Sequence, residues 1–117
     1  MLRLLKATLN SWNGLRAAAR SEQAFRQEIV ALLIAIPAAF LVAAETWRRI
    51  ALIGVIVLLM IVELLNTAIE KLADRLTMDR DPKIGQVKDM GSAAVGVALL
   101  MAGLFWLFAL AERMGAI

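Results

Sequence analysis

The sequence contains no cysteine and no histidine among its 117 residues. The absence of cysteine excludes disulfide frameworks, thiol nucleophiles and zinc–thiolate sites. The absence of histidine excludes imidazole bases, Ser-His-Asp triads and His-ligated metals. Charged residues are also scarce, at 20%, whereas hydrophobic residues make up 62% and the mean hydropathy is +0.76. So short and apolar a chain is not an ordinary water-soluble domain, and lipid is its natural solvent.

Gly-rich phosphate-binding motifs are absent as well, because the chain has neither Gly-x-x-x-x-Gly-Lys-[Ser/Thr] nor Gly-x-Gly-x-x-Gly. Any bound nucleotide must therefore occupy a site outside the usual kinase folds. The net charge is +3 and the pI is about 10.0. In so apolar a chain this balance indicates basic segments facing anionic lipid headgroups, and no nucleic-acid partner is expected.

Three apolar segments predict transmembrane helices over residues 26–47, 50–69 and 90–111, each long enough to cross about 30 Å of hydrocarbon. Pro37 lies within the first of them and predicts a kink, because a neighbouring helix can satisfy the carbonyl that proline leaves free. The uncharged stretch within it, Ile29–Ala44, ends in Val-Ala-Ala, as a signal peptide would. The long basic region before it and the two spans after it favour a retained helix.

The distribution of basic residues predicts the orientation of the chain in the membrane. Residues 1–28 hold five Lys or Arg, residues 70–89 hold five, and only Arg48, Arg49 and Arg113 remain. Because Lys and Arg in short loops are concentrated on the cytoplasmic side, the N-terminus should be inside and the C-terminus outside. Three crossings require the same arrangement.

Residues 1–20 form an amphipathic pattern rather than a span. Leu2, Leu5, Leu9 and Trp12 recur at spacings of three and four residues, which predicts a helix lying in the membrane interface. Ser21 is then expected to cap the next helix. Glu22 would lie in the first turn of that helix, at the cytoplasmic boundary.

A polar stripe interrupts the second span. A helix advances about 100° per residue, so that Glu63, Asn66, Thr67, Glu70 and Asp74 fall on one face. A charged Glu within a span costs about 2.5 to 3.5 kcal/mol on insertion scales, which favours a functional role for Glu63. The alternative is that Glu63 only snorkels or bonds to a neighbouring helix.

The stripe suggests chemistry on a hydroxyl group at the membrane interface, with Glu63 as the general base. Glu70 lies about 10 Å nearer the water, at the depth expected for Glu22. These two carboxylates could together hold Mg²⁺ bound to phosphate oxygens, although surface Glu residues often have no such role.

The segment 78–88 contains Pro82 and Gly85 and is predicted to be a cytoplasmic loop. Lys88, Asp89 and Ser92 would then begin the third span, where free amide groups and the helix dipole favour phosphate. The alternative is that this cluster only marks a helix boundary.

Three strings of residues resemble the motifs of the small bacterial integral-membrane diacylglycerol kinases. They are Glu63-Leu-Leu-Asn-Thr-Ala-Ile-Glu70, Asp74-Arg75 and Lys88-Asp-Met-Gly-Ser-Ala-Ala94, and Trp12, Gly14-Leu-Arg-Ala-Ala18 and the segment 22–28 extend the resemblance. The resemblance covers essentially the whole chain as one domain, 1–117. It implies an all-α homotrimer, with three transmembrane helices and one amphipathic surface helix per chain, that phosphorylates diacylglycerol to phosphatidic acid with MgATP in the bacterial inner membrane.

The resemblance also implies residue roles. Glu63 is expected to be the catalytic base, and Glu22 and Glu70 the carboxylates that hold the metal bound to ATP. Further nucleotide contacts are expected from Arg3, Asn10, Asp79, Arg80, Asp81, Lys88 and Asp89. The lipid substrate, whose hydroxyl meets Glu63, is expected to lie along Arg16, Gln27, Arg49, Asn66, Ser92 and Trp106.

Three other functions compete with this interpretation. A related branch of the same family phosphorylates undecaprenol, and the motifs do not distinguish the two lipid alcohols. A small proton-coupled exporter would need four spans, whereas this chain has room for three. A non-enzymatic assembly subunit would not require Glu63 beside Asn66. Because three helices cannot enclose both a lipid tail and a nucleotide, the kinase interpretation predicts sites formed between chains.

Overall fold

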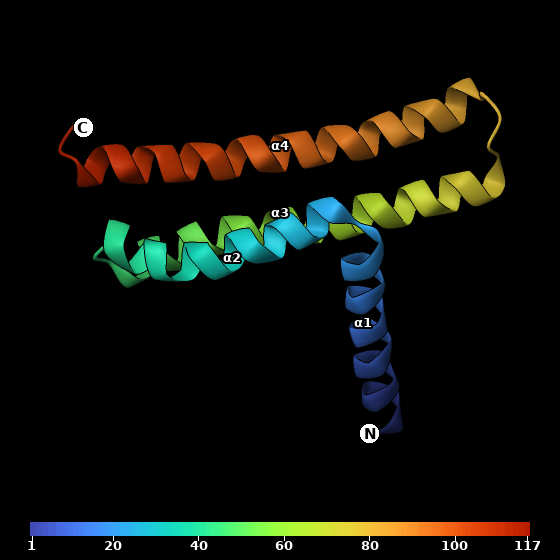
Figure 1. Cartoon of the computed structure of the whole chain (residues 1–117), viewed down its shortest axis with the longest axis horizontal. Helices are drawn as coiled ribbons and strands as arrows, with labels where there is room; N and C mark the ends of the chain where they lie inside the picture. The colour runs from blue at the N-terminus through green and yellow to red at the C-terminus, as the bar shows by residue number, and fades with distance from the viewer.

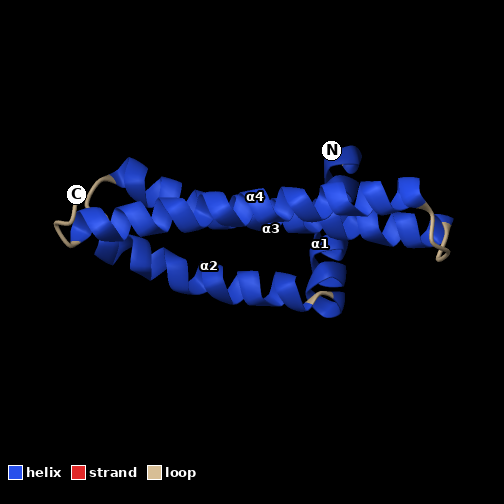
Figure 2. Cartoon of the chain, turned by 90° about the horizontal axis from the view of Figure 1, so that it is seen from above, coloured by secondary structure: helices blue, strands red, loops and turns tan.

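The computed structural model describes residues 1–117 and contains four helices and no strand, which confirms the all-α prediction. They are α1 (Leu2–Ser21), α2 (Gln23–Val42), α3 (Thr46–Leu76) and α4 (Pro82–Arg113). α2, α3 and α4 lie alongside one another, whereas α1 runs across them and projects from one side (Figures 1 and 2). The N-terminus is at the free end of α1, and the C-terminus is at the end of the bundle away from α1.

The three long helices are long and apolar enough to cross a membrane, as predicted. α2 continues through Pro37 but ends at Val42, five residues before the expected end of the first span, and Trp47 belongs to α3. The 31 residues of α3 measure about 46 Å at 1.5 Å per residue, more than the hydrocarbon thickness. The polar C-terminal part of α3 therefore extends beyond the membrane core.

The connection between α3 and α4 is shorter than the predicted loop 78–88. The Asp81 side chain caps α4, because one carboxylate oxygen accepts the backbone N–H groups of Lys83, at 2.9 Å, and Ile84, at 3.3 Å. Pro82 fits the first turn, where no N–H is needed. Lys88, Asp89 and Ser92 consequently lie in the second and third turns of α4. They do not lie at the helix N-terminus, so the prediction that free amide groups and the helix dipole act there beside them is wrong.

The break between α1 and α2 lies at Glu22, which has extended backbone angles. α1 includes Ser21, whose hydroxyl donates to the Ala17 carbonyl at 2.9 Å. Ser21 is therefore not the cap of α2, contrary to the prediction. The break itself was correctly expected near this position, and it places Glu22 where α1 meets the bundle.

Few side chains are buried within one chain. Only 15 of 117 residues are buried, and Phe25 near the start of α2 is the most enclosed large side chain, at 1% exposure. The indole N–H of Trp106 donates to the Leu52 carbonyl at 3.1 Å and joins α4 to α3. Most of the apolar surface of the long helices is thus exposed, as expected where lipid or other protein chains cover it.

Candidate active site

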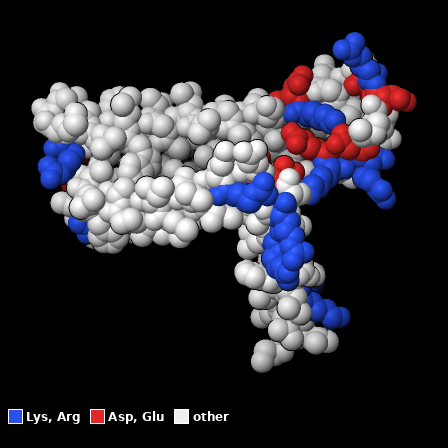
Figure 3. Space-filling model, in the orientation of Figure 1, with Lys and Arg blue, Asp and Glu red and all other residues white.

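Charged side chains are concentrated at the end of the bundle where α1 departs. Figure 3 shows Asp and Glu side chains gathered there and Lys and Arg along α1. The opposite end carries a smaller set, comprising Glu45, Arg48, Arg49, Glu112 and Arg113. The middle of the bundle shows mostly uncharged side chains in this view. The charged end is therefore where a polar substrate can bind.

The polar stripe of α3 leads from this end into the bundle, as predicted. Glu63 and Asn66 are each 8% exposed, and Thr67 is 6% exposed. Glu70 is half-buried and Asp74 is exposed. Burial thus decreases along the stripe toward the charged end, and Glu63 faces the protein interior.

Two other carboxylates lie close to Glu63. The charges of Glu22 and Glu70 act on Glu63, so the three acidic residues singled out from the sequence share one electrostatic environment. Glu28 of α2 also interacts electrostatically with Glu63 and was missed. One of its carboxylate oxygens is buried without a hydrogen-bond partner. The signal was available, because Glu28, like Glu63, is an acid inside a predicted span.

Asn66 connects the deep and outer parts of the stripe. Its Nδ2 donates to Oε1 of Glu70 at 3.3 Å, while its Oδ1 is buried without a partner. A buried acceptor without a donor costs about 1 to 3 kcal/mol, and this oxygen is enclosed against Gly91 of α4.

The donors at this end suit a hard divalent cation. The carboxylates of Glu22 and Glu70 are oxygen ligands of the kind that Mg²⁺ prefers. A single chain nevertheless has no group of three acidic side chains arranged to hold a metal ion. The residues therefore fit a metal that keeps phosphate oxygens or water among its ligands, as Mg²⁺ does in nucleotide sites.

Lys88 reaches the outer end of the stripe from α4. Its Nζ lies 2.5 Å from Oδ1 of Asp74, and both side chains are partly exposed. Asp89 and Ser92 are exposed on the same helix, and Asp79, Arg80 and Asp81 are exposed in the short connection before it. A phosphate group at this end would thus meet one lysine already held against α3.

Several predicted site residues lie away from Glu63. Trp106 is bonded to Leu52, which lies about 16 Å from Glu63 along α3. Arg49 is also at the far end, where its Nε donates to the Ala43 carbonyl at 2.8 Å and its guanidinium lies over the Phe40 ring. Arg3 is near the free end of α1, about 28 Å along that helix from Glu22. Glu22, Glu63 and Glu70 are called the acidic cluster below. One chain therefore does not bring Trp106, Arg49 and Arg3 to the acidic cluster.

Two cavities, called hollows below, flank the junction of α1 with the bundle. One of about 470 Å³ lies between α1 and α3, and its lining includes Ser11, Thr67 and Lys71. The other, of about 310 Å³, is lined in part by Arg16 and Phe25. Neither is lined by Glu63 itself. Two exposed residues of the predicted site lie on the helices that meet at this junction, Asn10 on α1 and Gln27 on α2.

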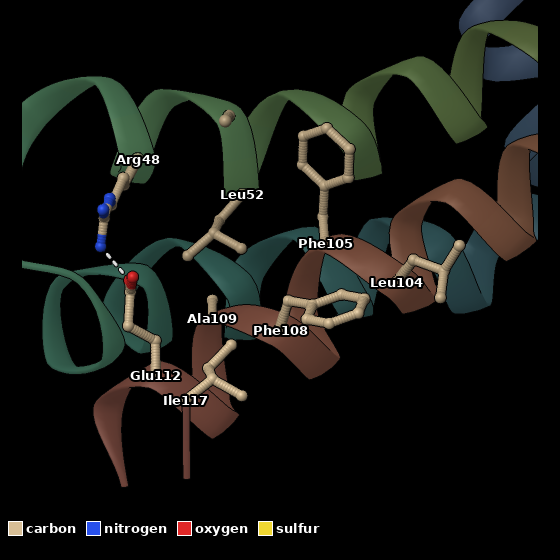
Figure 4. Close-up of a pocket in the computed structure, with 9 residues that line it drawn as sticks. Arg48, Leu52, Leu104, Phe105, Phe108, Ala109, Glu112 and Ile117 are labelled. Carbon is tan, nitrogen blue, oxygen red and sulfur yellow. Dashed lines mark hydrogen bonds and ion pairs between the residues drawn. The ribbon is translucent and has the colours of Figure 1, made fainter. Parts of the chain in front are cut away.

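A third hollow, of about 440 Å³, lies between α3 and α4 at the opposite end (Figure 4). Its lining is apolar, with Phe105 and Phe108 among the side chains, apart from an ion pair between Arg48 and Glu112. It offers no unpaired carboxylate for acid–base chemistry. The acidic cluster around Glu63 is therefore the candidate active site.

These features define a multi-pass helical membrane protein with its reactive groups at one end of the bundle, where water and lipid meet. Comparison with known proteins gives the particular family. The sequence pattern described as prokaryotic diacylglycerol kinase matches residues 9–110. The chain belongs to this family, as the sequence motifs suggested.

Curated relatives cover almost the whole chain. The diacylglycerol kinase of Escherichia coli (strain K12) is 44% identical over 113 residues, which are 97% of this chain and 93% of the relative. That of Pseudomonas aeruginosa is 45% identical over 104 residues, 89% of this chain and 85% of the relative. That of Haemophilus influenzae is 38% identical over 103 residues, 88% and 87% of the two chains. Membership identifies the chain as an ATP-dependent phosphotransferase.

Proposed function

We propose that this enzyme transfers the γ-phosphoryl group of ATP to the hydroxyl of 1,2-diacylglycerol and releases phosphatidic acid and ADP. The relatives named above are all diacylglycerol kinases, which supports this alcohol over undecaprenol. The observation that carries the proposal is the buried carboxylate of Glu63, inside a membrane helix and beside Glu22 and Glu70.

Glu63 acts as the general base. It accepts the hydroxyl proton as the lipid oxygen bonds to the γ-phosphorus and the bond from that phosphorus to the bridging oxygen of ADP breaks. Its depth in α3 supports this role, because the hydroxyl of diacylglycerol lies at the boundary between headgroups and hydrocarbon. The acyl chains then extend along the helices toward Arg49 and Trp106, which explains how a lipid site includes residues remote from Glu63.

Glu22 and Glu70 hold Mg²⁺ bound to ATP, and Asn66 orients Glu70 through its amide group. When bound, the metal neutralises charge on the phosphate oxygens. Lys88 contacts the transferred phosphoryl group, and the remaining nucleotide contacts come from Arg3, Asn10, Asp79, Arg80, Asp81 and Asp89. Arg16, Gln27, Asn66 and Ser92 contact the lipid near its hydroxyl.

The working enzyme is a homotrimer with sites shared between chains. The large exposed apolar surface and the distance from Arg3 to the acidic cluster support this assembly. Each chain lies in the bacterial inner membrane with the N-terminus and the charged end in the cytoplasm, and with the C-terminus outside. This orientation brings ATP to the acidic cluster from the aqueous side.

The test is the rate of ATP-dependent phosphatidic acid formation by purified Glu63→Gln protein. Loss of the base should lower kcat by about 10² to 10⁴-fold. Glu45→Gln, an exposed acid at the opposite end, is the control and should retain the activity. An unchanged rate in Glu63→Gln would overturn the role of the base. Faster labelling of undecaprenol than of diacylglycerol, with labelled ATP, would overturn the substrate.

A further inference from the structure

At Gly91, beside the acidic cluster, α4 packs directly against the Asn66 side chain of α3. Gly91 is buried, and a methyl group placed on its Cα would overlap Oδ1 of Asn66 and lie 3.3 Å from Cγ of the same side chain. A methyl group placed on any other glycine of the chain would meet no such neighbour within 4 Å. The absence of a side chain at position 91 is therefore what leaves room for the Asn66 amide.

Gly91 thereby limits where the Asn66 amide can go. The amide is confined between the backbone of α4 on one side and Glu70, to which it donates, on the other. One turn earlier on α4, the Lys88–Asp74 ion pair holds the same two helices together. The helices are thus held together on the outer side of the amide, and the atoms that a methyl group on Gly91 would displace are those of the Asn66 side chain.

We infer that Gly91 is a positioning residue of the kinase, which acts through Asn66 to set the place of the Glu70 carboxylate in the metal–nucleotide site. The inference rests on the proposed function, because Glu70 is a metal ligand only in that proposal. Gly91 itself touches neither the substrate nor the metal. Its effect is expected in the metal dependence of the enzyme, because the hydrogen bond between Asn66 and Glu70 is what a displaced Asn66 would lose.

The first experiment compares Gly91→Ala with Gly96→Ala in the full-length enzyme. Both changes add one methyl group to α4, but a methyl on Gly96 meets nothing within 4 Å. Gly91→Ala should raise the Mg²⁺ concentration for half-maximal rate by about tenfold, the order expected when a hydrogen bond to a charged group is lost. Gly96→Ala should leave this concentration unchanged.

A second readout does not depend on catalysis. Mn²⁺ takes the same oxygen ligands as Mg²⁺, and its binding is followed by electron paramagnetic resonance in the presence of ATP and the absence of lipid substrate. Gly91→Ala should weaken Mn²⁺ binding by a similar factor. A purely structural effect would lower the thermal midpoint and the fraction of active enzyme but leave the metal affinity of the remaining folded protein unchanged.

A double-mutant cycle separates the effect of Gly91→Ala through Asn66 from its other effects. It also gives a result if Gly91→Ala alone folds poorly. Asn66→Ala removes the group with which the methyl collides, so Gly91→Ala/Asn66→Ala should fold like Asn66→Ala and have the same metal dependence. An equal loss of metal affinity on adding Gly91→Ala in both backgrounds would overturn the inference. So would an unchanged metal affinity in Gly91→Ala itself. Neither result would affect the assignment of Glu63, which its own variant tests.

Discussion

Lys88 of α4 lies 2.5 Å from Asp74 of α3, fourteen residues earlier in the chain. The pair joins the two helices at the outer end of the polar stripe and holds the lysine beside the acidic cluster. Both side chains are more than a third exposed, at 39% and 45%, so the pair contributes little to stability in water. Its importance lies in where it places the ammonium group.

Lys88→Met should therefore reduce catalysis far more than stability. In the proposed mechanism Lys88 contacts the transferred phosphoryl group, and loss of this charged donor should lower kcat by about 10² to 10³-fold. The measurement is the initial rate at saturating ATP and diacylglycerol. Lys83→Met is the matched control, since Lys83 is an exposed lysine on the same helix without an ion pair, and equal losses in the two variants would exclude a specific role for Lys88.

Removal of divalent metal should abolish the reaction, and Glu22→Gln and Glu70→Gln should each raise the Mg²⁺ requirement. Replacing a carboxylate by an amide removes a charged ligand, for which we expect a shift of about tenfold or more. The measurement is the rate as a function of free Mg²⁺ after treatment with a chelator. Glu112→Gln, at the far end of the bundle, should not change the curve; a wild-type curve for Glu70→Gln would show that this residue is only a boundary acid.

Phe25→Ala should destabilise the junction of α1 with the bundle. Phe25 is 1% exposed and lines the hollow beneath α1 together with Arg16. We expect a loss of about 2 to 3 kcal/mol, less than the usual Phe→Ala value, because the unfolded reference in a membrane is itself apolar. Unfolding in mixed detergent micelles, followed by tryptophan fluorescence, measures the change. Leu41→Ala, at a position 77% exposed, should have little effect on the same curve.

The proposed orientation is tested by labelling introduced cysteines, because the natural chain has none. Met78→Cys lies in the connection between α3 and α4, and Ala44→Cys in that between α2 and α3. A membrane-impermeant thiol reagent should label Met78→Cys only in inside-out vesicles and Ala44→Cys only in right-side-out vesicles. The reverse pattern would place the acidic cluster outside the cell and contradict the proposal.

The sequence predicts the main features of the fold because they depend on local properties. Hydropathy locates three spans, and helical periodicity places Glu63, Asn66 and Glu70 on one face, as found. The ends of the helices were less predictable. The polar residues 82–89 look like a loop, but Asp81 satisfies two free N–H groups, and α4 begins well before the apolar segment.

Other features depend on contacts between distant segments and have no local signal. The close approach of Gly91 to Asn66 requires the packing of α4 against α3, and the bond from Trp106 to Leu52 requires the same pairing. Serine commonly caps helices, yet the hydroxyl of Ser21 donates to the preceding turn of α1. The break between α1 and α2 lies at Glu22 instead. Glu28 does have a local signal, because it is an acidic residue within a predicted span, as Glu63 is.

The break at Glu22 couples a carboxylate directly to the attachment of α1. If α1 lies in the headgroup layer, as its amphipathic pattern predicts, while α2 crosses the hydrocarbon, the depth of one helix sets the depth of the other, and Glu22 lies where they meet. Bilayer thickness and headgroup packing are then part of the geometry of the acidic cluster. In the proposed arrangement, bilayer thickness would therefore affect the geometry of the site, in addition to the bilayer supplying the proposed substrate.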